Sequence, residues 1–426
     1  MMRRAVTATV AGLMMATAPN VAWSRPQAAA AAQVRLDPAR IDRALEQMVA
    51  SGRVAGTSVL VWKDGREAYF GYAGFADREA KRPYARDTIV QIWSMTKPVT
   101  GVALMQLWET GKLQLDAPLA RYLPEFATML VQDGSDATGK PLWRPAKRAI
   151  TVRDLLRHTA GLAYGGGPSA AEAAFAAADP LAIDHDLAEF GRRIARVPLI
   201  ADPGERWAYS AAVDVQALLV ERLSGMVYAD YVQQRILDPL KMRETGWKQP
   251  LDRLPRLAAT YRRDNGGPLT RQDDALTRRM NFPGAALTMG GAGLAAPIDD
   301  YMRFARMLLN GGELDGARIL KASTVRLMAT DQLDPAITER GFLPGKGNVG
   351  FGFDLAVRRG PPLTAQENRG AIGEFFWDGA ASTLFWVDPA NRMAVVFFTQ
   401  AMPFDGTLHT DIRRAVYGDA YLGPSG

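Results

Sequence analysis

The sequence predicts an α/β protein, in the α+β arrangement, in which both chain ends contribute to one antiparallel sheet and a mainly helical domain is inserted between them. Runs of β-branched and aromatic residues with strand-like patterning occur near the two ends, between residues 57 and 75 and between residues 351 and 399. Residues 117–350 instead show helical periodicity interrupted by long loops. We therefore expect one sheet closed by the two chain ends and flanked by helices.

This pattern divides the chain into two regions. We expect residues 25–116 and 351–426 to form an α/β domain around the sheet, and residues 117–350 to form a mainly helical domain with lid loops. The chain has 426 residues, of which 48% are hydrophobic, so it can bury a large core without disulfide bonds. Two stretches rich in Ala, Gly, Pro or charge, residues 163–180 and 262–293, are predicted to be surface lids.

The first elements have clear local signals. Asp37, followed by a proline, predicts the start of a helix that ends at Gly52. Residues 57–62 and 67–75 are β-rich and flank Asp64-Gly65, a dipeptide typical of tight hairpin turns.

Further helices and strands follow from periodicity. The segment from Met95 to Thr110 is apolar on nearly all sides, which predicts a buried helix. Thr151 and Asp154 form a capping box for a helix over 152–158. Further helices are predicted over 213–224, 227–237, 299–310, 322–330 and 407–418, and strands over 351–357, 371–377, 382–387 and 393–399.

The N-terminal residues are typical of an export signal. A positively charged start is followed by a mostly apolar stretch from Ala5 to Ala18, and Ala22-Trp23-Ser24 offers a small-x-small cleavage pattern. The alternative, a transmembrane anchor, needs about 20 apolar residues, more than this stretch or any other segment has. We expect residues 1–24 to be a signal peptide and the protein to be exported, periplasmic or secreted, without an integral membrane segment after cleavage.

Composition excludes several classes of site. The chain has no cysteine, and its three histidines, at 158, 185 and 409, are scattered. Thiol chemistry is excluded and a His/Cys metal site is not expected, so the prediction is no metal and no cofactor. The formal net charge is +6, but basic residues are spread along the chain, so we expect no nucleic-acid partner. No particular oligomeric state is predicted.

The sharpest local motif is Ser94-Met95-Thr96-Lys97. A Ser and a Lys three residues apart at the start of a helix lie one turn apart on the same face, so the amine can reach the hydroxyl. A lysine can take a serine proton if burial lowers its pKa. By itself the motif is weak evidence for catalysis, because spacing alone favours an N-cap serine followed by an incidental lysine.

Two other segments supply context. Tyr209 follows a turn at Pro203-Gly204 and precedes a predicted helix, a placement that can aim a phenol into a cleft; an ordinary half-buried tyrosine is the alternative. Trp377-Asp378-Gly379-Ala380 lies between two predicted strands, where the glycine lets the backbone approach a ligand closely; the alternative is a β-turn between core strands.

Four motifs, in order, resemble a known family: SMTK at 94–97, TVRDLLRHTAGL at 151–162, PGERWAYS at 203–210 and WDGAASTLFWVDP at 377–389. Together they are similar to the family VIII carboxylesterases, serine esterases of the class C β-lactamase and penicillin-binding-protein-like family. The resemblance covers residues 37–418 and implies a β-lactamase-like fold. No G-x-S-x-G motif, the nucleophile elbow of α/β-hydrolases, occurs in the chain.

The resemblance implies a role for each matching residue. It makes Ser94 the nucleophile that accepts the acyl group, Lys97 its immediate partner and Tyr209 the general base. Backbone N–H groups of Ser94 and Ala380 would form the oxyanion hole, and Trp377 and Gly379 would contact the substrate.

The chain also departs from the β-lactamase pattern. Where those enzymes carry Tyr-x-Asn it has Tyr209-Ser210-Ala211, and where they carry Lys-Thr-Gly it has Trp377-Asp378-Gly379. An amide and a cation that would bind a β-lactam are thus replaced by apolar surface, which favours short-chain neutral esters as substrates. Modest hydrolysis of β-lactams such as cephalosporins is still compatible with these residues.

Other functions remain open on the same fold. They are a β-lactamase or D-Ala-D-Ala peptidase, an acyltransferase, and a non-catalytic penicillin-recognising protein. The three histidines have no catalytic context. His158 is expected to be structural, bonding the last carbonyls of a helix, while His185 falls in a lid and His409 in the last helix. Asp354 and Asp388 are expected to be turn or solvent-facing carboxylates.

Overall fold

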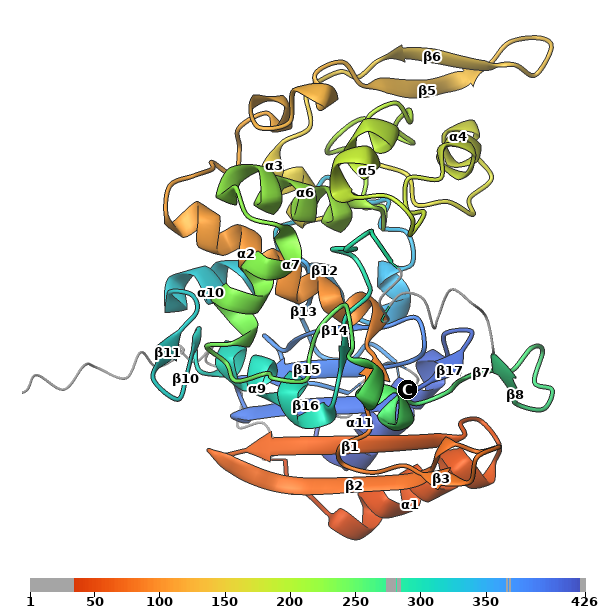
Figure 1. The fold of residues 1–426 in the computed structure, drawn as a ribbon, viewed down its shortest axis with the longest axis vertical. Helices are drawn as coiled ribbons and strands as arrows, with labels where there is room; N and C mark the ends of the chain where they lie inside the picture. The colour runs from red at the N-terminus through yellow and green to blue at the C-terminus, as the bar shows by residue number, and fades with distance from the viewer. Residues whose placement is uncertain (1–33, 273–280, 282–284, 365–366, 368, 422–426) are drawn as a thin grey trace, which may run out of the picture.

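One antiparallel sheet joins the two ends of the chain, as the strand patterns predict. The computed structural model describes residues 34–272, 281, 285–364, 367 and 369–421 (Figure 1). Within them eight strands form a sheet in the order β12-β13-β14-β15-β16-β1-β2-β3. The late strand β16 pairs with the early strand β1, Val59 lying opposite Phe397. The strands are β1 (Gly56–Lys63), β2 (Arg66–Asp77), β3 (Arg82–Pro83), β12 (Val349–Phe351), β13 (Ala356–Arg358), β14 (Phe375–Asp378), β15 (Leu384–Asp388) and β16 (Met393–Thr399).

The predicted helices are present with small shifts at their ends. The α-helices are α1 (Pro38–Ala50), α2 (Lys97–Glu109), α3 (Val152–Leu156), α4 (Ala170–Ala178), α5 (Leu187–Ile194), α6 (Ala212–Ser224), α7 (Tyr228–Val232), α9 (Ile298–Leu309), α10 (Ala322–Met328) and α11 (Gly406–Tyr417). Short 3₁₀-helices are η1 (Trp93–Thr96), η2 (Leu119–Arg121), η3 (Pro124–Phe126), η5 (Leu251–Arg256) and η6 (Leu343–Lys346), and η4 (Gln233–Leu237) is a π-helix.

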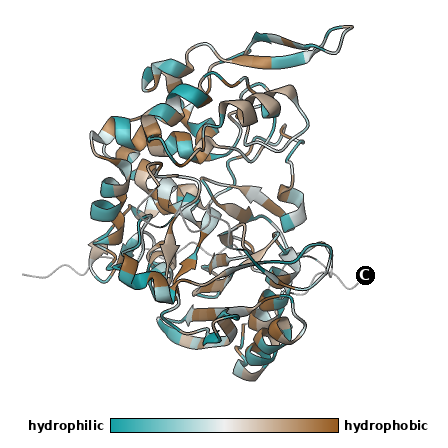
Figure 2. Ribbon diagram, turned by 45° about the vertical axis from the view of Figure 1, so that its right-hand side comes forward, coloured by the Kyte–Doolittle hydropathy of each residue, from teal (hydrophilic) through white to brown (hydrophobic). Residues whose placement is uncertain are grey.

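Local sequence explains where the first elements begin and end. The Asp37 side chain accepts a hydrogen bond from the Arg40 amide, 3.2 Å away, and so caps α1. Asp64 and Gly65 both have positive φ, 52° and 81°, which turns β1 back onto β2. Most residues of α2 are buried, because its apolar residues surround the helix axis. Helices on the outside of the molecule carry both hydrophilic and hydrophobic residues (Figure 2).

Neighbouring residues of one strand show which helix covers which face of the sheet. Phe385 and Trp386 follow each other on β15, so their side chains point to opposite faces. Phe385 contacts Tyr301 of α9, whereas Trp386 stacks on Tyr417 of α11. Helix α1 packs against α11 and against β1 and β2. The sheet is therefore a central layer between α9 on one face and α11 on the other.

The segment between β3 and β12 is mainly helical, and one of its helices, α9, covers a face of the sheet. Helix α6 packs against α2, α3, α5 and α7, while α9 packs against β1, β15 and β16. The sequence did not predict the hairpin of β5 (Leu130–Ser135) and β6 (Pro141–Pro145), which projects from the helical end of the molecule (Figure 1). Shorter strands are β4 (Val90–Gln91), β7 (Thr260–Arg262), β8 (Thr270–Gln272), β9 (Ala295–Ala296), β10 (Glu313–Leu314), β11 (Ala317–Arg318) and β17 (Ala401–Met402).

Two aspartates predicted to be turn or solvent-facing carboxylates lie at turns but are buried. Asp354 lies in the turn between β12 and β13 but faces inward, where it accepts a hydrogen bond of 3.1 Å from the Gln216 amide. Asp388, at the end of β15, lies under α11 and accepts a hydrogen bond of 2.8 Å from the Tyr417 hydroxyl. The prediction of solvent exposure is wrong at both positions, because helices from distant parts of the chain cover these strand ends.

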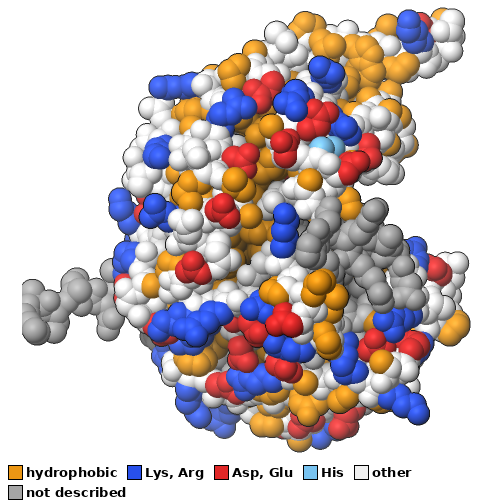
Figure 3. Space-filling view, in the orientation of Figure 1, with side chains coloured by type: hydrophobic (Ala, Val, Ile, Leu, Met, Phe, Trp, Pro, Cys, Tyr) orange, Lys and Arg blue, Asp and Glu red, His pale blue; other side chains and the backbone are white. Residues whose placement is uncertain are grey.

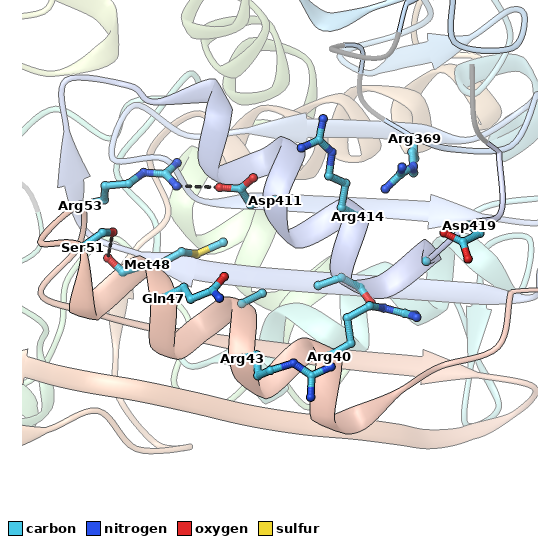
Figure 4. A pocket seen from close by; sticks show the side chains of 13 residues that line it. Arg40, Arg43, Gln47, Met48, Ser51, Arg53, Arg369, Asp411, Arg414 and Asp419 are labelled. Carbon is cyan, nitrogen blue, oxygen red and sulfur yellow. Dashed lines mark hydrogen bonds and ion pairs between the residues drawn. The ribbon is translucent and has the colours of Figure 1, made fainter. Parts of the chain in front are cut away.

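A surface groove between α1 and α11 has a volume of about 670 Å³, and five of the thirteen residues that line it are arginines (Figure 4). Arg40 Nε donates to the Ala415 carbonyl at 2.8 Å, and the Arg53 guanidinium contacts Asp411 at 2.6 Å. These contacts join α1 and the turn that follows it to α11. None of the predicted site residues lines the groove, so it is distinct from the candidate active site.

The predicted signal peptide, residues 1–24, lies outside the described residues, as do residues 273–280 and 282–284 of the predicted lid at 262–293. In the part that is described, no helix is long and apolar enough to cross a membrane.

Candidate active site

Ser94 lies in a strained turn that leads into the buried helix α2. The preceding residue, Trp93, has a φ of 49°, in the left-handed region that non-glycine residues seldom adopt. Ser94 itself is half-buried within η1, and Lys97 is the first residue of α2. Backbone strain of this kind persists where surrounding contacts hold a side chain in a required position.

The side chain of Lys97 reaches back one turn to the serine, as the S-x-x-K spacing predicts. Its Nζ atom lies 3.2 Å from Ser94 Oγ, 2.7 Å from the Gly291 carbonyl oxygen and 3.3 Å from the Tyr164 hydroxyl. The side chain is buried, which lowers the pKa of Lys97 to about 8, although nearby carboxylates, Asp214 foremost, oppose this shift. A lysine with this pKa can accept a proton near neutral pH.

A buried carboxylate supports the lysine from α6. Asp214 Oδ1 accepts a hydrogen bond of 2.9 Å from the Gly291 amide, and the carbonyl of the same glycine accepts from Lys97. Burial raises the pKa of Asp214, while the positive charge of Lys97 opposes that shift. Residues from three distant segments thus fix the ammonium group, and sequence spacing carried no signal for Asp214 or Gly291.

Tyr209 lies on the other side of Lys97, before α6, as predicted. The Lys97 Nζ atom is 4.6 Å from the centre of the Tyr209 ring, a cation–π distance. Among the described residues, no group makes a hydrogen bond with the phenol oxygen of Tyr209. Burial raises the pKa of Tyr209 well above its usual value; Tyr164 adds to this shift, and the nearby Ser94 and Trp377 side chains oppose it. The phenol is therefore protonated at neutral pH.

Tyr164 is a site residue that the sequence analysis missed. It falls in the Ala- and Gly-rich stretch predicted as a lid, yet its hydroxyl contacts Lys97 and its ring packs edge-on against Tyr209 at 5.4 Å. Burial raises the pKa of Tyr164 as well. The only sequence signal was its position, two residues beyond the RHTAGL segment.

The two amides predicted to form the oxyanion hole have no acceptor. In the described part of the chain, neither the Ser94 N–H nor the Ala380 N–H donates a hydrogen bond, and Ala380 is exposed at the end of β14. Such free amides beside a nucleophile can stabilise the negative oxygen of a tetrahedral intermediate.

Gly379 explains how the Ala380 segment comes close to Ser94. A Cβ atom at position 379 would lie 2.5 Å from the Ile92 carbonyl oxygen and 3.2 Å from Trp93 Cβ, so no larger residue fits without displacing this backbone. The glycine was predicted to let the backbone approach a ligand. In this structure the close approach is to the chain that precedes Ser94.

Aromatic side chains form one wall of the site. The Trp377 ring lies 5.6 Å from the Tyr209 ring, and Phe342 lies 5.3 Å from Tyr209 on another side. Trp377 is buried, whereas Phe342 is half exposed. In Figure 3, hydrophobic side chains gather in the hollow between the helical end of the molecule and the part that carries the sheet.

An ion pair lies next to Trp377, where the sequence predicted apolar surface without a cation. Lys346 of η6 makes a close contact with the carboxylate of Asp378, and both residues are largely buried. The Lys346 Nζ atom lies 5.0 Å from the centre of the Trp377 ring. The prediction failed here because Lys346 is 32 residues from Asp378 in sequence and only the fold brings them together.

The histidines find their polar partners away from Ser94. His158 is buried, as expected for a structural residue, and its ring packs on Tyr209 at 4.9 Å, but its Nδ1 accepts from the Ser210 amide at 3.3 Å instead of bonding helix carbonyls. His409 Nε2 contacts the Ser382 carbonyl oxygen at 2.9 Å. His185 Nδ1 lies 3.2 Å from the Asp186 carbonyl oxygen. Over the described residues, no group of three or more His, Asp or Glu side chains could hold a metal ion.

Comparison with known proteins identifies the family of the chain. Residues 41–418 match the Beta-lactamase family model. The chain is 35% identical to Protein Rv1367c of Mycobacterium tuberculosis, over 89% of this chain and 93% of that protein. It is 32% identical to esterase EstB of Burkholderia gladioli, over 89% of this chain and 95% of the esterase. The structure of EstCE1, a hydrolase with promiscuous acyltransferase activity, superposes with a TM-score of 0.71 at 28% identity, covering 89% of this chain and 98% of that one.

The fold and the relatives define a serine hydrolase class that contains both esterases and acyltransferases. The chain belongs to the beta-lactamase family, and within that family it is a family VIII esterase-like protein.

Proposed function

We propose that the protein hydrolyses short-chain carboxylic esters through an acyl-enzyme at Ser94. One observation carries this proposal: the Lys97 Nζ atom lies 3.2 Å from Ser94 Oγ. Burial lowers the pKa of that lysine to about 8, so a neutral amine is accessible near neutral pH.

The reaction follows from the positions of these groups. Lys97 takes the proton of Ser94 as its Oγ bonds to the ester carbonyl carbon, and the amides of Ser94 and Ala380 stabilise the resulting oxyanion. The bond to the alcohol oxygen then breaks, and that oxygen takes a proton from the Tyr209 phenol, which Lys97 reprotonates. A water molecule then attacks the acyl carbon, and the protons move in the opposite direction. Tyr209 takes a proton from the water and passes one to Lys97, and Lys97 protonates Ser94 Oγ as its bond to the acyl group breaks. The products are the carboxylic acid and free Ser94.

The proposed role of Tyr209 differs from that of an initial general base. Because burial keeps its pKa high, the phenol is a proton donor in the resting protein, and Lys97 Nζ lies 3.2 Å from Ser94 Oγ. Tyr209 then acts as an acid toward the leaving alcohol and as a base only in the deacylation step.

A second candidate is acyl transfer to an alcohol other than water. EstCE1 is a hydrolase with promiscuous acyltransferase activity, and the chain covers 98% of that protein. The same acyl-enzyme serves both reactions, so the outcome depends on whether water or an alcohol reaches it first.

The test is hydrolysis of p-nitrophenyl esters of graded acyl length beside a chromogenic cephalosporin, with and without an added acceptor alcohol. We expect ester turnover, fastest with short acyl chains, modest cephalosporin turnover, and loss of both in Ser94→Ala. Ester turnover that persists in Ser94→Ala would reject Ser94 as nucleophile. Cephalosporin turnover above ester turnover would make the protein a β-lactamase.

We also propose that residues 1–24 direct export and are removed. The support is the sequence pattern alone: a charged start, an apolar stretch and a small-x-small site ending at Ser24. Mass spectrometry of the N-terminus of the exported protein tests this, and an intact Met1 would reject cleavage.

A further inference from the structure

The ion pair of Lys346 and Asp378 lies in the wall of the candidate active site. Asp378 is the last residue of β14, two residues before the amide of Ala380. Lys346 ends η6, on a separate segment. Their side chains are only 10% and 11% exposed, so each charge is held mainly by the other.

Aromatic rings surround this pair and connect it to the catalytic residues. The Lys346 ammonium lies 5.0 Å from the centre of the Trp377 ring and 5.4 Å from that of Phe342. Both rings contact Tyr209, at 5.6 and 5.3 Å. Because Tyr209 protonates the leaving alcohol in the proposed reaction, the pair lies on the side of the site that receives the alcohol part of the substrate.

The third group beside the ion pair, His409, adds no charge to it. On a third side, Nδ1 of His409 lies 4.0 Å from the Asp378 carboxylate. Burial lowers the pKa of His409 to about 4, so this imidazole is neutral at pH 7. One cation and one anion therefore cancel beside the rings of Trp377, Phe342 and Phe404, of which Phe342 and Phe404 are 50% and 44% exposed.

We propose that Asp378 determines substrate specificity by neutralising Lys346, so that the alcohol part of the substrate must be uncharged. This inference rests on the proposed function. A substrate carboxylate at this position would be attracted by Lys346 and repelled by Asp378 at similar distances. The net attraction would be small, while the carboxylate would still have to lose its hydration. Without the Asp378 charge, the largely buried Lys346 would instead bind an anionic group.

Equilibrium binding of two matched alcohols tests the proposal without turnover. The anionic probe is 4-hydroxybenzoate and the neutral probe is methyl 4-hydroxybenzoate, which share a phenol but differ in charge. Both are titrated by calorimetry at pH 7 into Ser94→Ala, and into Ser94→Ala combined with Asp378→Asn, with Lys346→Met, or with both. Hydrolysis of the two corresponding acetate esters by the protein with Ser94 intact is measured separately and tests the esterase activity itself.

In Ser94→Ala we expect the neutral probe to bind more tightly. Asp378→Asn should raise the affinity ratio of anionic to neutral probe at least about tenfold, the size of a charge-assisted hydrogen bond, and Lys346→Met should lower it. The double replacement, which removes both charges, should return the ratio to within about threefold of the starting value.

The outcomes separate the two proposals. An unchanged ratio in folded Asp378→Asn, or a ratio that stays high after Lys346 is also removed, overturns the role of Asp378. If circular dichroism shows that Asp378→Asn does not fold, Lys346→Met is compared with the double variant. An anionic-to-neutral affinity ratio in Lys346→Met that is no lower than in the double variant then overturns the proposal. Absent hydrolysis of both acetates, with binding as expected, would reject the esterase activity and leave the binding result intact.

Discussion

The Lys97 ammonium faces the Tyr209 ring, 4.6 Å from its centre, while the same Nζ atom lies 3.2 Å from Ser94 Oγ. Burial favours the neutral lysine, and the nearby carboxylates, Asp214 foremost, favour the charged one. The balance places the pKa of Lys97 at about 8, far below an exposed lysine and close to working pH. A lysine with this pKa can take the serine proton in the proposed reaction.

The rate of ester cleavage should rise with pH and level off above about 8, because Lys97 must lose its proton before it can accept one from Ser94. Below that value kcat/KM should fall about tenfold per pH unit. Lys97→Arg keeps the charge but cannot be deprotonated, so its activity should drop at least about 100-fold. A flat profile between pH 6 and 9 would contradict Lys97 as the base.

The two site tyrosines should differ in effect. Tyr209→Phe should lower kcat about 100-fold or more, because the leaving alcohol loses its proton donor. Tyr164→Phe should lower kcat less, and should move the pH profile to lower pH, because it removes an acceptor that favours charged Lys97. Tyr72→Phe, at an exposed position on β2, is the matched control. A Tyr164→Phe profile unmoved or shifted to higher pH would argue against this contact.

Gly379→Ala should damage catalysis more than stability. Its Cβ atom would lie 2.5 Å from the Ile92 carbonyl oxygen and must displace the segment carrying Ser94 and the oxyanion amides. We expect kcat to fall about 100-fold, the effect of losing one oxyanion donor. Gly246→Ala is the control, because the nearest atom to a Cβ at position 246 is the Lys248 carbonyl oxygen, 3.9 Å away. Kinetics and urea unfolding measured on both variants check this, and a near-normal kcat in Gly379→Ala would contradict the packing argument.

Asp354 should tolerate replacement by asparagine but not by alanine. Burial raises the pKa of Asp354 well above its usual value, which favours the neutral carboxyl group, and an amide of the same shape can still accept the hydrogen bond from Gln216. Asp354→Asn should therefore change the free energy of unfolding by less than about 1 kcal/mol, whereas Asp354→Ala should cost about 2 to 4 kcal/mol. Urea denaturation distinguishes them. Equal losses in both variants would mean that Asp354 is ionised.

His409 should make the protein sensitive to acid. The unfolded chain binds a proton at this histidine below pH about 6.5, whereas burial holds its pKa in the folded protein to about 4. Stability is therefore lost as pH falls from 6.5 to 4, by up to about 3 kcal/mol. His409→Gln can keep the bond to the Ser382 carbonyl oxygen without titrating.

The comparison is made by urea unfolding of both proteins at pH 7, 5 and 4. The advantage of the original protein over His409→Gln should shrink or reverse at low pH, and a constant difference would contradict the assignment. Ester cleavage at pH 8 should survive in His409→Gln, as in replacements of His158 and His185, because the side-chain hydrogen bonds of all three histidines go to groups other than Ser94, Lys97 and Tyr209.

Local signals predicted much of the fold. The Asp64-Gly65 turn, the cap at Asp37 and the apolar circumference of 95–110 each act over a few residues, so sequence alone locates them. The sheet closed by β1 and β16 was also predictable, because strands at the two chain ends need partners. The β5–β6 hairpin was missed because its mixed, mostly exposed residues give no alternating pattern.

What the sequence determined by itself is the local geometry of the nucleophile: helical spacing sets Ser94 and Lys97 one turn apart wherever the helix lies. Only the tertiary structure decided the rest. Burial lowers the pKa of Lys97, Gly291 and Tyr164 bind its ammonium, and Lys346 meets Asp378 across 32 residues of sequence. These depend on segments far apart in the chain, whose contacts and solvent exclusion exist only once the core has formed.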